Sequence, residues 1–471
     1  MTNLIVAKFG GSAIGADGSS IPIILHRINE LKKNAKVITV FSAPLTIQNG
    51  KTRSLTDIVL DLGRKAESGE QVNVNEIKQA YQKILELVSS DFQKECDSIV
   101  NSYVENCKKA LDDARQKEEF ADEIRSRALA YSGELLMSQV MNYIMKGQGI
   151  KSSAVQLDSW PIITDNNIES TNFLSSESSE RIQSLEKLLS DNDVVSIAGF
   201  IGKTVDGIIT TYERGGSDRT AADLGILFYK KFNTSIDFEK DSAVVSADPK
   251  IVGEGLSDVT QLSYNEARLA GMFGMKILDP ITIKEILEHG ADMPIIITNM
   301  KEPSKTTTIK RRPDVQNGHP LKIVTGKRNC AIFRIETKSA ERLLDSLEHD
   351  KRYSEFIILS PYTKDGVEFT RILFLDGDYV KRNEKYLLGF DSLATITYNR
   401  GVITLIGDEM WRVQQIASKA SAKIGEAGLN ILNMDAQEET SRIIIVIEDS
   451  QKNIEKAIQA IHLERSKIKF V

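Results

Sequence analysis

The stretch that decides the fold is Leu4-Ile5-Val6-Ala7-Lys8-Phe9-Gly10-Gly11, six strand-forming residues followed by two glycines. Apolar residues then recur at helical spacing from Ile21 to Lys33, and Val37 to Phe41 is a second apolar run. A strand–helix–strand order, with a glycine break after the first strand, predicts a parallel sheet with helices on both faces. We therefore expect an α/β fold for the N-terminal part of the chain.

The α/β pattern is interrupted once and then resumes. Over residues 56–145 apolar residues return at helical intervals between charged ones, which predicts a helical insertion. Further strands are expected at residues 194–198, 207–211 and 243–245, with a last one near 294–298. The first domain should therefore cover residues 1–300.

The last third of the chain has a different pattern. Residues 301–320 are rich in Lys, Arg, Thr and Pro and show no apolar period, so we expect a linker there. Beyond it, elements in the order βαββα occur over residues 396–471, and a less regular copy occurs over 321–395. This pattern predicts two small ferredoxin-like modules.

Composition excludes several classes of protein. The 471 residues are 41% hydrophobic and 27% charged, with a net charge of −6, so no polybasic surface for nucleic acid is expected. No apolar run approaches the roughly 20 residues that cross a bilayer, and no signal peptide is recognisable. Three cysteines and five histidines form no disulfide framework or metal-binding spacing. We expect a cytoplasmic protein without membrane or nucleic-acid partners.

Four clusters of residues could carry chemistry. Residues 8–15 and 214–225 are glycine turns that lead into helices, where backbone N–H groups can approach an anion. Lys8 adds a positive charge to the first turn, and Arg214 is a candidate carboxylate clamp in the second. Glu134 on an apolar helix needs a positive partner, such as a substrate ammonium. Lys276 lies in an apolar stretch, where it could meet a phosphate.

Each cluster also has a plainer interpretation. Residues 8–15 could be only a tight turn, and residues 214–225 a surface salt bridge beside an ordinary helix cap. Glu134 could face solvent, and the Lys276 side chain could extend to water. Together, however, the clusters favour phosphoryl transfer to an amino acid. A carboxylate acceptor is already ionised and needs no catalytic base, so lysines, backbone N–H groups and Mg²⁺ would suffice.

The motifs, taken in order, resemble those of the aspartate kinases of the amino-acid kinase superfamily. Residues 8–15 are similar to K-F-G-G-T-S-V-G, and Gly133-Glu134 matches the end of S-x-G-E, with Tyr131 in place of the serine. Residues 199–218 match G-F-I-G…T-T-L-G-R-G-G-S-D, and 262–276 resemble S-Y-x-E-A…F-G-A-K. The resemblance covers nearly the whole chain.

The resemblance implies a fold, an activity and a set of ligands. The fold would be an amino-acid kinase domain followed by two βαββαβ ACT domains, with residues 321–326 forming a strand of the second. The activity would be ATP-dependent phosphorylation of the L-aspartate side chain to 4-phospho-L-aspartate, the first step of lysine, threonine and methionine biosynthesis. The ligands would be ATP with Mg²⁺ and an amino-acid effector bound at the ACT domains. The chain would form a homodimer or a dimer of dimers.

Site residues can be carried over position by position. No protein-held metal is implied, and the residues form three groups. The catalytic group would be Lys8, Gly10, Gly11 and Asp218; the substrate group would be Ser12, Ser42, Thr56, Glu134, Arg214, Gly215, Gly216 and Ser217; the nucleotide group would be Lys8, Glu239, Lys240, Val245, Lys250 and Lys276.

Two segments depart from the family pattern. In residues 238–250, Glu239 and Lys240 replace Thr-Asp, and Glu239 near phosphates would need Lys240 or Mg²⁺ to offset its charge. In residues 436–443, acidic residues replace the small residues of the effector strands, so inhibition by lysine or threonine is not implied. Two alternatives therefore stay open: a catalytically silent amino-acid-binding subunit, and a kinase of another amino-acid carboxylate.

Overall fold

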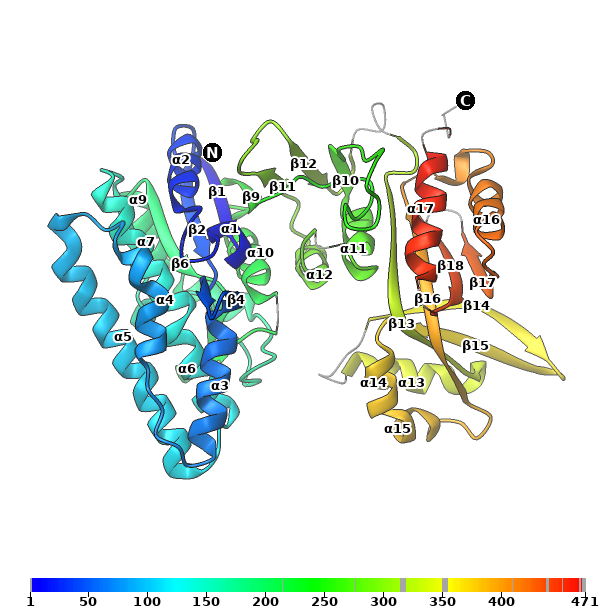
Figure 1. Ribbon diagram of the computed structural model, residues 1–471, viewed down its shortest axis with the longest axis horizontal. Helices are drawn as coiled ribbons and strands as arrows, with labels where there is room; N and C mark the ends of the chain where they lie inside the picture. The colour runs from blue at the N-terminus through cyan, green and yellow to red at the C-terminus, as the bar shows by residue number, and fades with distance from the viewer. Residues whose placement is uncertain are drawn as a thin grey trace. The chain divides into compact units, whose positions relative to one another are not determined.

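A computed structural model describes residues 2–213, 215–275, 277–313, 319–349, 355–408, 410–437, 440–450, 452–465 and 467. The chain forms two compact units, whose elements are labelled in Figure 1. The first unit contains Met1–Ala243 and Ile281–Lys310, and the second contains Val244–Pro280 and Arg311–Val471. The chain therefore passes from the first unit into the second at residue 244, returns to the first at residue 281, and enters the second again at residue 311.

A mainly parallel sheet forms the centre of the first unit. Its strands run in the order β12-β11-β9-β1-β2-β6-β5. All neighbours are parallel except β12, which is antiparallel to β11. The bounds are β1 Asn3–Phe9, β2 Lys36–Phe41, β5 Ser152–Ala154, β6 Val194–Ala198, β9 Asn233–Lys240, β11 Ile295–Asn299 and β12 Thr306–Lys310. The α/β prediction for this part is confirmed.

Helices cover the sheet and form the insertion. The helices α2 (Ile21–Leu31), α7 (Glu134–Gly147), α9 (Gln183–Asp191) and α10 (Gly216–Phe228) pack against its strands. The insertion expected over 56–145 contains α3 (Leu55–Glu67), α4 (Asn75–Leu85), α5 (Ser90–Lys117), α6 (Asp122–Ser132) and α7. Further α-helices are α1 (Gly11–Ile14), α8 (Ser175–Arg181) and α12 (Pro280–Glu288), whose first residue still belongs to the second unit. The insertion shares one apolar core with β1, β2 and α2.

Three expectations about strands are corrected. The strand expected at 207–211 is β8 (Ile209–Thr211), which pairs with β7 (Ile201–Lys203) in a separate hairpin. Residues 243–245 form no strand, only an isolated bridge from Val245 to Asp258. The expected linker contains β12, in which Thr307 and Ile309 are buried and their neighbours are more exposed. This alternation has the period of two that is typical of a strand. Threonine is not counted as an apolar residue, so the sequence pattern did not indicate the strand.

The second unit is built on a six-stranded antiparallel sheet in the order β14-β15-β13-β16-β18-β17. Its long strands are β13 (Ile323–Glu336) and β16 (Thr395–Ile406), and both pass through the two modules. The others are β14 Phe356–Lys364, β15 Val367–Phe374, β17 Asn433–Ala436 and β18 Arg442–Glu448. Residues 323–327 of β13 pair with 402–406 of β16, beside β18, so the first module is inserted into the second.

Two separate apolar cores lie on this sheet. One joins β13, β16 and β18 to α16 (Ile416–Glu426) and α17 (Asn453–Arg465). The other joins β13 and β15 to α13 (Thr337–His349), α14 (Gly377–Arg382) and α15 (Glu384–Leu388). The two ferredoxin-like modules are thus observed. Within the described ranges, no helix has the length and apolar character needed to cross a membrane.

Candidate active site

A cavity of about 730 Å³ lies at the carboxyl ends of β1, β2 and β6 in the first unit. Ligands of α/β proteins bind at this edge, where chain connections diverge to the two sides of a strand. Ten predicted residues line the cavity: Lys8, Gly11, Ser12, Ser42, Thr56, Glu134, Gly215, Gly216, Ser217 and Asp218. Residues from three of the four sequence clusters and both sides of the sheet are therefore brought together.

Four helices point their N-termini at this cavity. Lining residues come from the first turns of α1, α3, α7 and α10. Ser54 caps α3 by accepting a hydrogen bond from the backbone N–H of Asp57. Unpaired N–H groups and the helix dipoles give such ends a partial positive charge. The cavity is therefore suited to an anionic ligand.

Lys8 is the next-to-last residue of β1, and its side chain bends back over the glycine turn. A Cβ atom added at Gly10 would lie 3.0 Å from the Lys8 Nζ atom, so glycine leaves the room that the ammonium occupies. At Gly11 the same addition would lie 3.1 Å from the carbonyl oxygen of Ala43. The two predicted glycines thus keep the turn close both to Lys8 and to the segment after β2.

The Lys8 ammonium forms an ion pair with Asp218 across the cavity floor. Lys8 Nζ lies 2.7 Å from Asp218 Oδ1, and about nine-tenths of each side chain is buried. Asp218 stands in the first turn of α10, after Gly215, whose φ of 91° places it in the left-handed region that glycine adopts freely. The pair fixes a cation at the end of the central strand.

Ser42 and Ser217 link the two sides of the cavity. Ser42 follows β2, and its Oγ donates a hydrogen bond to Ser217 Oγ over 2.9 Å. A Cβ atom added at Gly199, which follows β6, would meet Ser217 Cβ at 2.6 Å. The N-terminus of α10 therefore packs tightly against the carboxyl ends of β2 and β6.

Glu134 is the first residue of α7 and is buried at the cavity wall. Burial raises the pKa of its carboxyl group from 4.5 to about 7. Backbone N–H groups of Ala43 and of Glu134 itself, and the charge of Lys8, partly oppose this rise. A buried carboxylate with an unmet need for positive charge can bind a cationic group.

Lys240 and Glu239 are neighbours on β9 but occupy opposite faces of the sheet. Lys8 is in register with Phe238, and Phe9 with Glu239, so the alternation of side chains puts Lys240 on the same face as Lys8. Burial lowers the pKa of the Lys240 ammonium, and the charges of Asp218 and Lys8 both act on it. Lys240 therefore adds positive charge near the cavity floor.

Glu239 instead pairs with an arginine that the sequence reading missed. Arg27 of α2 donates hydrogen bonds from Nη2 over 2.8 Å and from Nε over 3.1 Å to the Glu239 carboxylate. Glu239 is fully buried in this pair. This corrects the expectation that Glu239 faces phosphates and that Lys240 or Mg²⁺ offsets its charge.

Replacing Arg27 by lysine is expected to destabilise the first unit by about 1–2 kcal/mol, because an ammonium cannot make the paired hydrogen bonds of a guanidinium. Denaturant unfolding at pH 7.5 measures the effect. The matched control is Arg53→Lys, which alters a half-exposed pair with Asp61 and should cost less than about 0.5 kcal/mol. Equal losses in both variants would contradict the structural role of the buried pair.

Two further predicted residues lie outside this cavity. Val245 and Lys250 belong to the second unit, where the Lys250 backbone N–H donates to Asp248 and Lys250 is exposed. Arg214 and Lys276 lie outside the described residues. Among the residues that are described, no three His, Cys, Asp or Glu side chains come together as a possible metal site.

The cavity has a second charged pair that the motifs did not indicate. Arg125 of α6 donates a hydrogen bond from Nε to Glu169 Oε1, and its Nη2 lies 2.9 Å from Asp122 Oδ1. Arg125 and Glu169 both line the cavity. On the sequence alone, Arg125 is an ordinary polar position of an amphipathic helix, so nothing singled it out.

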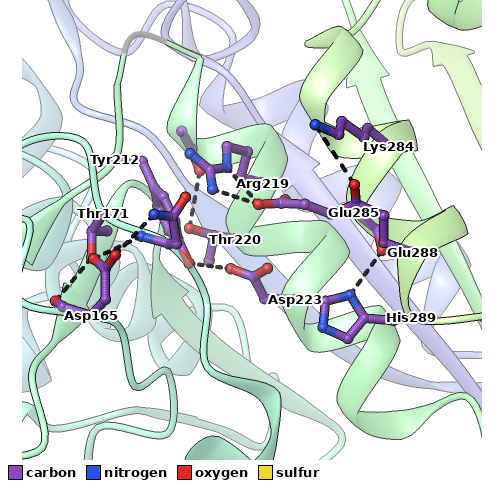
Figure 2. A network of polar contacts seen from close by, with 12 residues as sticks. Asp165, Thr171, Tyr212, Arg219, Thr220, Asp223, Lys284, Glu285, Glu288 and His289 are labelled. Carbon is purple, nitrogen blue, oxygen red and sulfur yellow. Dashed lines mark hydrogen bonds and ion pairs between the residues drawn. The ribbon is translucent and has the colours of Figure 1, made fainter. Parts of the chain in front are cut away.

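A buried polar network supports α10 behind the cavity wall (Figure 2). Tyr212, which lines the cavity, donates a hydrogen bond to Asp223 of α10. The Arg219 guanidinium lies 4.4 Å from the centre of the Tyr212 ring and bonds to Glu285 of α12, with 2.9 Å from Nε to Oε1. Burial raises the pKa of Asp223 well above its usual range, and the nearby Glu285 charge adds to the rise. The network ties α10 to α12 and to the cavity.

The sequence matches the amino acid kinase family over residues 3–299. The chain belongs to this family. The match covers residues 3–243 and 281–299 of the first unit and 244–280 of the second, and it includes every residue that lines the cavity. The amino acid kinase fold is thus confirmed for this part.

Individual relatives extend the similarity beyond the amino acid kinase domain. The chain is 22% identical to aspartokinase 3 of Bacillus subtilis over 98% of both chains. It is 23% identical to a bifunctional aspartokinase/homoserine dehydrogenase of Buchnera aphidicola over 97% of its own length. The chain spans about half the length of the bifunctional relatives or less, 56% of the Buchnera protein and 35% of an Arabidopsis thaliana chloroplast protein.

Solved structures of the same fold support this comparison. Escherichia coli aspartokinase III, crystallised with aspartate and ADP, aligns over 98% of this amino acid kinase and 99% of its own chain, with a TM-score of 0.76 at 16% identity. Clostridium acetobutylicum aspartate kinase aligns over the same shares with a TM-score of 0.71 at 22% identity. The fold, including the C-terminal modules, is therefore that of the aspartokinases.

Proposed function

We propose that this amino acid kinase is an aspartokinase, which transfers the γ-phosphoryl group of ATP to the side-chain carboxylate of L-aspartate. The observation that carries the proposal is the cavity that joins the Lys8–Asp218 pair to the buried Glu134. Motif matches along the chain and relatives named as aspartokinases support the choice of aspartate. The structure of the E. coli relative was determined with aspartate and ADP.

The proposed reaction needs little acid–base chemistry. An oxygen of the aspartate side-chain carboxylate forms a bond to the γ-phosphorus, and the bond from that phosphorus to the bridging oxygen breaks. ADP leaves with the electron pair, and 4-phospho-L-aspartate remains, without transfer of a proton. Mg²⁺ enters with the phosphates of ATP as part of the substrate.

The residues of the cavity would supply positioning and charge. Lys8 and Lys240 would neutralise the transferring phosphoryl group, and the Gly10-Gly11 turn would let backbone N–H groups approach it. Glu134 would bind the aspartate ammonium, and Arg214 its α-carboxylate. Ser12, Ser42, Thr56 and Ser217 would complete the acceptor site. Lys276 is proposed near the nucleotide phosphates, and Val245 and Lys250 near the nucleotide.

A coupled assay of ADP release tests the proposal. With MgATP present, release should depend on L-aspartate at millimolar concentration, and glutamate and N-acetylglutamate should serve poorly. Turnover with another carboxylate would identify a different acceptor. Amino-acid binding without any turnover in calorimetry and in the assay would indicate the silent subunit instead.

A second cavity, of about 390 Å³, supports an effector site in the C-terminal module. Its lining includes Ser418 from the first turn of α16, together with Trp411, Gln437 and Arg442. The Arg442 Nη2 atom lies 3.6 Å from Asp435, and its buried Nε atom has no hydrogen-bond partner among the described residues. We propose that an amino-acid effector binds here through its carboxylate.

Arg442→Gln is expected to weaken effector binding by at least tenfold, because it removes the cation that would face the carboxylate. Calorimetry of the full chain with each amino acid identifies the effector, and the variant is then titrated with it. Arg382→Gln is the control, since Arg382 is exposed on α14 of the other module. Unchanged affinity in Arg442→Gln would contradict this location.

A further inference from the structure

A sharp break between two helices places Glu134 in the cavity. Helix α6 ends at Ser132, α7 begins at Glu134, and the single residue between them, Gly133, has φ −102° and ψ −106°. A Cβ atom at Gly133 would lie 3.0 Å from the Leu129 carbonyl oxygen and 3.2 Å from the Ala43 Cβ atom. The break turns the chain so that the first side chain of α7 faces the cavity.

The backbone carbonyl groups at this break accept hydrogen bonds from the hydroxyl group of a side chain on helix α4. Tyr81 of α4 is completely buried, and its OH lies 2.9 Å from the Gly133 oxygen and 3.1 Å from the Ser132 oxygen. Tyr81 does not line the cavity. Burial raises the pKa of the Tyr81 hydroxyl well above 10, and the Glu134 charge adds to the rise, so the group stays a donor.

We propose that Tyr81 is a positioning residue for the acceptor amino acid, acting through Glu134. Its hydroxyl holds the two carbonyls that precede Glu134, and so fixes where the carboxylate meets the Ala43 N–H and the cavity. Helix α4 of the insertion thereby takes part in substrate recognition without touching substrate. This inference rests on the proposed function, in which Glu134 binds the aspartate ammonium.

The alternative is that Tyr81 only fills the core, where its ring packs among the apolar residues of the insertion. Phenylalanine at this position keeps the ring and removes only the hydroxyl. This one substitution therefore distinguishes the two roles. If Tyr81 only fills the core, the substitution changes stability alone; if Tyr81 positions Glu134, it changes the binding of the acceptor.

The experiment compares Tyr81→Phe with the unaltered full chain. We expect the KM for aspartate to rise about five- to tenfold, with the KM for ATP and kcat within twofold. Tyr103→Phe is the control: Tyr103 lies on α5 of the same insertion and packs edge-on against Tyr131, and its hydroxyl has no hydrogen-bond partner within the described residues. That variant should leave all three parameters within twofold.

A double-mutant cycle tests whether the effect passes through Glu134. Calorimetry with L-aspartate should show a five- to tenfold loss from Tyr81→Phe in the unaltered chain, and less than twofold in the Glu134→Gln background. An unchanged aspartate KM in Tyr81→Phe, or an equal loss in both backgrounds, would overturn the inference. If the unaltered chain neither turns over nor binds aspartate, the proposed function fails instead.

Discussion

Lys8→Ala is expected to lower kcat for aspartate-dependent ADP release by about 10²–10³-fold, with the KM for aspartate within about threefold. Loss of one preorganised charge on the reacting group typically costs this much. The Lys8 ammonium is held 2.7 Å from Asp218 at the end of the central strand, so the unbound enzyme already has it in place. Steady-state kinetics with saturating MgATP measures the change.

The control for Lys8 uses a lysine at the opposite end of the sheet. Lys36 begins β2, and its Nζ atom donates to the Asn192 carbonyl oxygen over 2.7 Å. Lys36→Ala should leave kcat within twofold. A kcat of Lys8→Ala above one-tenth of the original value would contradict the assignment of Lys8 to the phosphoryl group.

Glu134→Gln is expected to raise the KM for aspartate by roughly 30- to 100-fold, because a buried, charge-assisted pair with an ammonium is worth about 2–3 kcal/mol. The unaltered enzyme should show a related pH dependence. With a pKa of about 7, Glu134 is increasingly protonated below pH 7, so the aspartate KM should rise as the pH falls from 8 to 6. Initial rates across this range measure both effects.

The same substitution should stabilise the fold in alkaline solution. A carboxyl group whose pKa is raised by folding stabilises the native state below its ordinary value of 4.5, and this contribution is lost as the pH rises through 7. Glutamine does not ionise, so Glu134→Gln should exceed the original chain in stability by up to about 3 kcal/mol at pH 8, and by little at pH 5. Denaturant unfolding at both pH values measures this difference.

Glu105→Gln is the matched control, because Glu105 is exposed on α5 of the insertion. It should change neither the aspartate KM nor the pH dependence of stability. The assignment of Glu134 would be contradicted if its glutamine variant kept the original KM, or if its stability at pH 8 fell below that of the original chain.

The sequence allowed prediction of the parts of the site that lie next to glycine turns. Lys8, Ser217 and Asp218 were identifiable because a strand, a glycine pair and a helix start are consecutive in the chain. The pairing of Arg27 with Glu239 was not, since 212 positions separate the two residues and Arg27 occupies a helical position like any other polar residue. The role of Tyr81 was not predictable for a related reason. Its ring fits the apolar period of α4, and nothing in the neighbouring sequence indicates which groups its hydroxyl contacts.

The fold was predictable where apolar runs are long and uninterrupted. Strands β1, β2 and β6 agree with expectation, since each is almost wholly buried. Strand β12 is not predictable in this way, because its buried face consists of Thr307 and Ile309 and so contains a single apolar residue. Residues 243–245 have the apolar composition of a strand, but the boundary between the two units falls after Ala243, and these residues form only the isolated bridge from Val245 to Asp258.

The shared strand β13 has a consequence for any attempt to separate or edit the C-terminal modules. One half of it pairs within each module, and the two halves meet at a register irregularity between Lys327 and Cys330. Cutting the chain between the modules would therefore leave each with a truncated strand and an open sheet edge. Deleting a single residue of β13 on one side of the irregularity would turn the core side chains of that half of the strand to the opposite face of the sheet. The side chains of the other half would still face the core of their module. The two modules should therefore be expressed, transplanted and engineered as one piece.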